Sequence, residues 1–296
     1  NNTALGALAL DAATTGGNNT ALGRSAASAV TTGNNNTAAG YAALENTTTA
    51  SNLTAIGVNA LHANTTGDNN TAVGLNSANS NTTGANNVSV GVNCFRLNTT
   101  GVNNTAIGRD SLESNTTASN NTAYGYASLQ ANTTGEQNVA VGVYALDAST
   151  TAQRNTAIGY NAGTTVTTGS YNAILGAYAG EDINTGQHNT FIGYDSGPNV
   201  QDGDFNVTLG SNALHTSISA DKNTAIGYQS MYFTTTGNNN VAVGSDSLKA
   251  NTTGDYNSAV GSAALDANTS GDENTAMGYG ALTNSTTGNY NTAYGR

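Results

Sequence analysis

Hydrophobic and polar positions follow one short pattern that recurs along the whole chain. Each repeat contains a segment such as Asn-Thr-Ala-Ile-Gly, in which an aliphatic residue precedes a glycine. This glycine, called the reference glycine below, recurs every 17 residues without insertion or deletion. The reference glycines are Gly6, Gly23, Gly40, Gly57, Gly74, Gly91, Gly108, Gly125, Gly142, Gly159, Gly176, Gly193, Gly210, Gly227, Gly244, Gly261, Gly278 and Gly295. Because loops normally tolerate changes of length, a period this strict indicates repeats that stack in register.

Positions at the same distance from the reference glycine form columns of similar residues. The Asn column lies four residues before the glycine, the Ala column two before and the aliphatic column one before. The Leu column lies four residues after it, and Thr-Thr pairs such as Thr65-Thr66 lie eight and nine after. Leu53 is the one exception in the Asn column. The ladder-forming residues include Asn19, Asn36, Asn70, Asn104, Asn121, Asn155, Gly108, Gly125, Gly142, Ile107, Val141, Ile158, Leu112, Leu129 and Leu146.

This pattern predicts stacked strands rather than helices. Each repeat is rich in Gly, Thr and Asn, which disfavour helices, and it lacks an apolar period of about 3.6 residues. The segment that ends at the reference glycine is typical of a short strand bounded by turn residues. We therefore predict an all-β fold: a parallel β-solenoid, or β-roll, with coils of 17 residues and about 17 coils in all. We expect one continuous array over residues 1–296, forming a segment of a longer chain.

Stacking gives each column a physical role. Asn side chains can pass amide hydrogen bonds from coil to coil. The glycines are expected at corners where φ is positive or where a Cβ has no room.

Three consecutive repeats depart from the columns in a compensating way. The Leu column becomes Gly163, Gly180 and Gly197, whereas larger residues enter two other columns. These larger residues are Val166, Ile183 and Val200 seven after the reference glycine, and Ile174, Phe191 and Thr208 in the Ala column. Since close-packed interiors conserve volume, these columns are expected to share one core.

The strand alternation leaves two alternatives for the core face. If the Ala column faces inward, the aliphatic column forms an exposed apolar stripe; if the aliphatic residues face inward, the Ala column forms a narrow outer seam. Either arrangement provides a face for a partner, so we expect a homo-oligomer.

Composition and charge limit the classes of partner that this chain is expected to bind. The net charge of −11, with only 7 Lys and Arg, argues against a nucleic-acid partner. No apolar stretch is long enough for a transmembrane helix, so we expect no membrane insertion by this segment. The single cysteine, Cys94, lies in a column of small residues and is expected to be a small buried hydrophobe.

No constellation of catalytic, cofactor-binding or metal-binding residues stands out. His62 and His215 share a column nine repeats apart and His188 lies in another, so no two are expected to bind one metal. Acidic residues of one loop column indicate a solvated face, with calcium as the less favoured alternative. These residues are Asp68, Asp204, Asp221, Asp255 and Asp272. A phosphate-binding loop and a nucleophile elbow are both absent, and we expect no enzyme and no cofactor.

Other surface columns suggest binding, but each also has a structural explanation. Sequons such as those at Asn46, Asn64 and Asn132 can arise from the ladders themselves. Tyrosines follow six reference glycines and could contact sugars or a neighbouring subunit, although stacking between coils is the simpler explanation. These are Tyr41, Tyr126, Tyr160, Tyr194, Tyr228 and Tyr279. The Thr-Thr pairs raise the alternative of ice binding; adjacent residues of a strand face opposite ways, so only one Thr column can face outward.

The repeats resemble a known family. The segments NTAVG (ending at Gly74), NTAIG (Gly108) and NVAVG (Gly142) are similar to repeats in the YadA-like heads of trimeric autotransporter adhesins. Related arrays resemble regions of phage tail fibres and bacterial surface proteins. The resemblance covers the whole chain and implies a left-handed parallel β-roll, three chains side by side, displayed outside the cell or on a virion to bind host or matrix surfaces. Two features depart from that family: the repeat here is longer, and no neck or stalk motif is present.

We therefore expect an extracellular structural or adhesive fibre segment that associates with itself as a trimer or filament, with a host-surface glycan or matrix as a further partner. The alternative is a monomeric ice- or polysaccharide-binding solenoid. Phe191, Pro198 and Asp202, in a stretch that departs from the columns, are the candidates for a local surface specialisation, although a repacked coil is the favoured explanation of this stretch.

Overall fold

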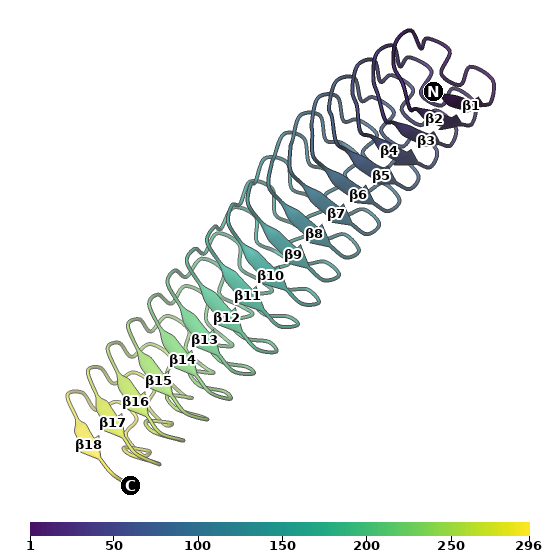
Figure 1. The fold of residues 1–296 in the computed structure, drawn as a ribbon. Helices are drawn as coiled ribbons and strands as arrows, with labels where there is room; N and C mark the ends of the chain where they lie inside the picture. Colours follow the sequence, from purple (N-terminus) through teal and green to yellow (C-terminus); the bar gives the residue numbers. More distant parts are fainter. The chain divides into compact units, whose positions relative to one another are not determined.

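The structure, a computed structural model, describes residues 1–296 and contains two compact units. Unit 1 comprises Asn1–Ala152 and unit 2 comprises Gln153–Arg296, and each is described by itself. Both are parallel β-solenoids built from three-residue strands without helices, which confirms the predicted fold class and the 17-residue coil (Figure 1). No helix of the structure is long and apolar enough to cross a membrane.

The strands recur at the predicted positions in both units. Unit 1 holds β1 (Thr3–Leu5), β2 (Thr20–Leu22), β3 (Thr37–Ala39), β4 (Thr54–Ile56), β5 (Thr71–Val73), β6 (Val88–Val90), β7 (Thr105–Ile107), β8 (Thr122–Tyr124) and β9 (Val139–Val141). Unit 2 holds β10 (Thr156–Ile158), β11 (Ala173–Leu175), β12 (Thr190–Ile192), β13 (Val207–Leu209), β14 (Thr224–Ile226), β15 (Val241–Val243), β16 (Ser258–Val260), β17 (Thr275–Met277) and β18 (Thr292–Tyr294). Each strand is the three residues that precede a reference glycine.

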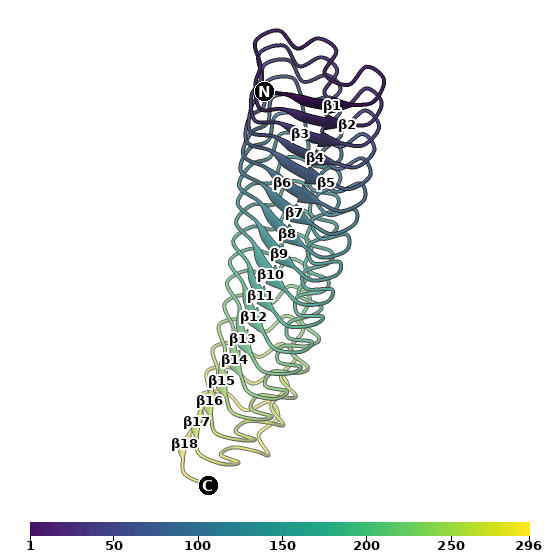
Figure 2. The ribbon, with the colours of Figure 1, turned by 45° about the vertical axis from the view of Figure 1, so that its right-hand side comes forward.

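Neighbouring strands pair in parallel without any slip of register. In unit 1, for example, Ala55 of β4 pairs with Ala72 of β5, and Ile56 pairs with Val73. The turned view shows the strands of each unit following one another in chain order, with the connecting segments stacked beside them (Figure 2). Those segments are hydrogen-bonded between coils as well: the Leu44 amide donates to the Ala60 carbonyl at 3.1 Å. The strict period therefore reflects pairing along the whole coil, and not along the strand alone.

The Ala column faces the core, which decides between the two alternatives for the strand. Ala55, Ala106 and Ala225 are completely buried, whereas the residues on either side of them are partly or largely exposed. The small side chain lets the opposite wall of the coil approach closely. Leu112, Leu129 and Leu146 of the Leu column fill the space that remains. The aliphatic column consequently lies on the outside.

The reference glycines meet both conditions that were expected of them. Gly108 has a φ of +133°, and a Cβ placed on it would lie 2.3 Å from the Gly125 carbonyl oxygen of the next coil. Gly125 and Gly142 also have positive φ, at +138° and +140°. A side chain is therefore excluded here both by conformation and by the next coil.

The repacked coils of unit 2 share one core, as predicted. Phe191 is fully buried, and a Cβ on Gly197 would lie 2.8 Å from its ring. A Cβ on Gly180 would lie 2.7 Å from Ile183, another buried side chain. The ring and the aliphatic side chain thus occupy the space that leucines fill in other coils.

The prediction of a surface specialisation is wrong for two of its three residues. Phe191 is buried because the glycines of the Leu column leave it room inside, and Pro198 is buried as well. The Pro198 carbonyl accepts a hydrogen bond of 2.6 Å from the Asp182 amide, so the proline fits the stacking of the coils. Only Asp202 is exposed.

Left-handed residues at fixed positions were not foreseen. Residues two and four after the reference glycine have φ near +55° even when they are bulky, as in Leu112 (φ +49°) and Phe95 (φ +52°). The amide of Leu112 is bonded to Ser128 of the next coil at 3.0 Å. Such conformations cost about 1–3 kcal/mol for non-glycine residues and persist only where surrounding contacts hold them.

Candidate functional site

The outer face of the strands carries a continuous series of exposed apolar side chains in each unit. The aliphatic column and the position just after the reference glycine are both exposed, and together they form what is called the outer stripe below. In unit 1 its most exposed members are Leu5, Leu22, Tyr41, Ile56, Val58, Leu75, Val92, Tyr124, Tyr126 and Val143. In unit 2 they are Ile158, Tyr160, Leu175, Tyr194, Leu209, Tyr228, Val260, Met277, Tyr279 and Tyr294. Apolar patches of this extent on soluble proteins mark interaction surfaces.

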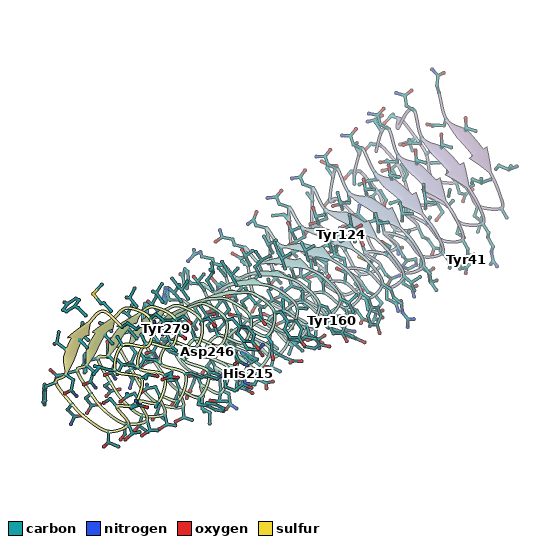
Figure 3. All side chains as sticks on the ribbon, turned by 90° about the horizontal axis from the view of Figure 1, so that it is seen from below. Tyr41, Tyr124, Tyr160, His215, Asp246 and Tyr279 are labelled. Atoms are coloured by element: carbon teal, nitrogen blue, oxygen red, sulfur yellow. The ribbon has the colours of Figure 1, made fainter.

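Of the predicted aliphatic ladder, Ile158 is 38% exposed, and Ile107 and Val141 are partly exposed. Tyr41 and Tyr124 of unit 1 and Tyr160 and Tyr279 of unit 2 carry rings on the same exposed columns (Figure 3). Since the strands beneath them are held in register by pairing, these side chains form ordered rows.

Arginines cover several tyrosines of the outer stripe. The guanidinium carbon of Arg24 lies 5.8 Å from the Tyr41 ring centre, and that of Arg109 lies 5.9 Å from the Tyr126 ring centre. Arg296 covers Tyr279 in the same way at 5.7 Å. These distances fit cation–π interactions.

A cluster of three tyrosines in unit 2 has no such arginine. Tyr160 and Tyr178 meet edge to face with ring centres 5.4 Å apart, and Tyr178 meets Tyr194 in the same way at 6.0 Å. Tyr160 and Tyr194 belong to the predicted Tyr column, whereas Tyr178 lies one position further along its coil. The predicted stacking between coils is therefore present here, but as edge-to-face pairs with a residue that the column did not include.

A second group of rings lies two residues before the strands of unit 2. His188 is stacked between Tyr171 and Phe205, with ring centres 4.8 and 4.9 Å apart. Arg154 lies over the other face of Tyr171 at 5.3 Å. Both faces of the Tyr171 and His188 rings are therefore covered within the chain, which favours a structural role for them.

The predicted Asn column is buried and bonds to the backbone more than to itself. Asn121 donates to the Gly135 carbonyl at 2.8 Å and accepts from the Asn138 amide at 2.9 Å. Asn19, Asn36, Asn70, Asn104 and Asn155 are equally buried and donate to the carbonyl 14 residues further on. At the exception, Leu53, the carbonyl that an asparagine would bind belongs to Gly67, and Asn70 binds it instead. Asn64 also binds this carbonyl, as its equivalents do in other coils.

A second asparagine ladder, seven residues after the reference glycine, is the one that links side chain to side chain. Asn81 donates to Asn64 at 2.8 Å and Asn98 donates to Asn81 at 2.7 Å, and the series continues through Asn115 to Asn132. The sequons at Asn64 and Asn132 lie in this buried ladder, so they arise from packing, whereas Asn46 is exposed.

The two threonine columns differ in exposure, although the pairs lie in bends and not in a strand as expected. The Thr65 hydroxyl donates to the Thr82 carbonyl of the next coil at 3.1 Å, and the Thr82 hydroxyl donates to the Thr99 carbonyl at 2.9 Å. Thr66, in the following column, is exposed. The Thr66 column is therefore the more exposed of the two, while the Thr65 column is partly exposed.

The acidic loop column lies at the surface, but its carboxylates also act on the backbone. Asp204 accepts from the Gln187 amide at 2.7 Å, Asp221 from the Asp204 amide at 2.8 Å and Asp272 from the Asp255 amide at 2.8 Å. Sequence reasoning missed this role because Ser and Asn occur in the same column. Asp, Asn and Ser share a side-chain oxygen that can accept a hydrogen bond from a backbone amide of the preceding coil.

His62 and His215 form contacts with neighbouring side chains, and the single cysteine is buried. His62 pairs with Glu45 at 2.9 Å, and His215 pairs with Asp195 at 3.1 Å while its ring stacks on Tyr232. Cys94 is fully buried, as predicted, and burial raises its pKa to about 11. No group of three His, Cys, Asp or Glu side chains in residues 1–296 could hold a metal ion.

Comparison of the chain with protein-family models and with curated proteins found no match. The outer stripe and the tyrosine cluster of unit 2 are thus the surfaces on which an argument about function can be based.

Proposed function

We propose that this chain is an extracellular structural and adhesive fibre segment whose solenoids associate with further copies through the outer stripe. The observation that carries the proposal is the outward orientation of the aliphatic column in both units. A long row of exposed leucine, isoleucine, valine and tyrosine side chains is costly to leave in water, at about 25 cal/mol per Å² of apolar surface. A second copy of the same regular surface would cover it.

The charge of the stripe supports self-association. Its members are aliphatic and aromatic with few charges, while the acidic residues of the chain lie in other columns. A chain with a net charge of −11 can therefore bring two such faces together without placing carboxylates against each other.

The resemblance to the heads of trimeric adhesins supports a trimer or filament at the cell surface or on a virion, where a repetitive surface binds host glycans or matrix by many weak contacts. That assembly and location are part of the proposal. Neither a catalytic constellation nor a cofactor is part of it.

Light scattering of the purified chain, with negative-stain images of the same sample, tests the proposal. We expect a trimer or a filament. Ile56→Lys together with Leu209→Lys places a charge on the outer stripe of each unit, and we expect this variant to be a monomer.

The matched control is Thr66→Lys with Thr236→Lys, which adds the same charge at exposed threonines outside the stripe. We expect the control to assemble like the parent chain. A parent chain that is monomeric would overturn the proposal and would favour a monomeric ice- or polysaccharide-binding solenoid.

A further inference from the structure

The tyrosine cluster of unit 2 has the geometry of an aromatic cage. The Tyr160 and Tyr178 rings are inclined at 73° and the Tyr178 and Tyr194 rings at 82°, so neighbouring rings form walls nearly at right angles. Tyr160 is 46% exposed and Tyr194 is 56% exposed, with Tyr178 partly buried between them. Unlike the stacked group around His188, this cluster leaves ring faces open.

The chain itself shows what tyrosines of this column bind. Tyr41, Tyr126 and Tyr279 each have an arginine guanidinium over the ring. The closest parallel is in unit 1, where Tyr126 meets Tyr144 edge to face at 5.2 Å and 80° while Arg109 covers Tyr126. The pair in unit 1 is thus an edge-to-face tyrosine pair with its cation in place.

Unit 2 supplies no cation to the corresponding cluster. Residues 155–221 contain no Lys or Arg. Of the four basic residues of unit 2, Arg154 and Arg296 lie over Tyr171 and Tyr279, and Lys249 binds Asp246 at 2.8 Å. The fourth, Lys222, lies in the column of Tyr171 and His188. The tyrosine cluster is therefore equipped for a cation that must come from outside.

Carboxylates at the edge of the cluster favour a positive charge. Glu181 is near enough to contribute to a raised pKa of the Tyr178 hydroxyl, after desolvation and Tyr160. One Glu181 oxygen accepts from Asn161 at 3.2 Å, which orients the carboxylate and leaves its second oxygen for a ligand. Asp195 follows Tyr194 directly and is held by His215.

We propose that Tyr160, Tyr178, Tyr194 and Glu181 form a binding site for an arginine side chain carried by a basic segment of a partner protein. Arginine fits better than a sugar because the cluster combines ring faces with an available carboxylate in a stretch without basic residues. The proposal deepens the adhesive function proposed above, on which its biological meaning rests, by stating the chemistry of a partner.

The test is the binding of a short arginine-containing peptide to the full chain at physiological ionic strength, by fluorescence anisotropy. The same peptide with citrulline in place of arginine keeps the shape and removes the charge. We expect binding of the arginine peptide, and about tenfold weaker binding of the citrulline peptide, since cation–π contacts and a charge-assisted hydrogen bond are lost.

Two variants locate the site and two matched variants serve as controls. Tyr178→Leu removes the central ring and Glu181→Gln removes the charge with little change of shape. Leucine already occurs at the position of Tyr178 in another coil, as Leu8. We expect about tenfold weaker binding for each. The controls, Tyr228→Leu and Asp202→Asn, change an exposed tyrosine and an exposed acid elsewhere in unit 2 and are expected to bind like the parent.

Absence of binding, equal binding of the citrulline peptide, or equal losses in the controls would overturn this site. Light scattering of the same samples separates the two proposals. Because Tyr160 and Tyr194 lie on the outer stripe, binding is also measured on the monomeric variant Ile56→Lys with Leu209→Lys. Absence of arginine binding by this monomeric variant overturns the cage alone, whereas a monomeric parent chain that binds arginine overturns self-association alone.

Discussion

At the scale of the residue, a buried asparagine side chain takes the place of missing backbone partners. Asn121 connects two segments of its own coil through the Gly135 carbonyl and holds the next coil through the Asn138 amide. Both partners are buried polar groups, and leaving such a group unpaired costs about 1–3 kcal/mol. Repeated in nearly every coil, this arrangement keeps a narrow solenoid rich in small residues closed.

The first prediction compares two adjacent asparagines. Asn121→Ala is expected to lower the free energy of unfolding by about 1–3 kcal/mol, because it leaves the buried Asn138 amide unpaired. It also removes one of the two hydrogen bonds to the Gly135 carbonyl, which Asn132 continues to bind. Asn120→Gly, which keeps the left-handed conformation of an exposed residue, is expected to change it by less than about 1 kcal/mol. Chemical denaturation followed by circular dichroism measures both. Equal losses would show that the buried hydrogen bonds do not account for the column.

Asparagine and glycine columns could be predicted from the sequence because each has a stereochemical meaning of its own. The left-handed conformation of Leu112 and its equivalents could not be predicted. Leucine usually avoids positive φ, and here the contacts between coils impose it. The hydrogen bonds made by the acidic loop column could not be predicted either, because its position holds different residue types, such as Asp204, Asn238 and Ser170. Only the structure shows that the side chains of all three accept a hydrogen bond from a backbone amide of the preceding coil.

At the scale of the coil, volume is exchanged between columns. The Phe191 ring occupies the space above Gly197, and any side chain at Gly197 would collide with it. This exchange was predictable because the substitutions in the three columns occur in the same coils. The less favoured interpretation, Phe191 as part of a surface specialisation, is wrong, and the favoured one, a repacked coil, is confirmed by its complete burial.

The second prediction is a rescue within this core. Phe191→Ala alone is expected to destabilise the chain by about 3–5 kcal/mol through the cavity it leaves. Gly197→Leu alone is expected to destabilise it as well, because the new side chain meets the Phe191 ring. The double variant restores the residue types of regular coils and is expected to recover at least half of the loss. Thermal unfolding of all four chains gives the coupling energy; additive losses would contradict a shared core.

The candidate site could be predicted from the sequence only in part, because one of the tyrosines in the cluster lies outside the Tyr column. The Tyr column predicted Tyr160 and Tyr194, but the ring between them, Tyr178, lies at a variable position two residues after a reference glycine. The missing arginine is visible in the sequence only as the absence of Lys and Arg over residues 155–221. That absence gains meaning once the structure shows arginines over the tyrosines of other coils.

At the scale of the whole molecule, stability within each unit depends on neighbouring coils. Each coil pairs with the next through its strand, its turns and its side-chain ladders, so the free energy approximates a sum of coil and interface contributions. Apolar side chains are arranged outward in rows, while negative charge is concentrated in the second half: residues 153–296 hold 11 Asp and Glu against 4 Lys and Arg. Tyr160 and Tyr194 also belong to the outer stripe, so self-association and recognition of a cation share part of the surface of unit 2.

The third prediction tests this additivity by removing one coil. Residues 103–119 and 120–136 occupy the same columns, so deletion of residues 103–119 joins two coils that keep every column aligned. We expect this chain to fold, with a melting temperature within a few degrees of the parent, because one coil and one interface are lost among many. Deletion of residues 103–118 leaves one coil a residue too long. Its columns cannot align with both neighbours, since a shift of one residue turns each side chain to the opposite face of a strand. We expect a marked loss of β-structure by circular dichroism, and equal stability of the two deletions would show that the 17-residue period is not what holds the coils together.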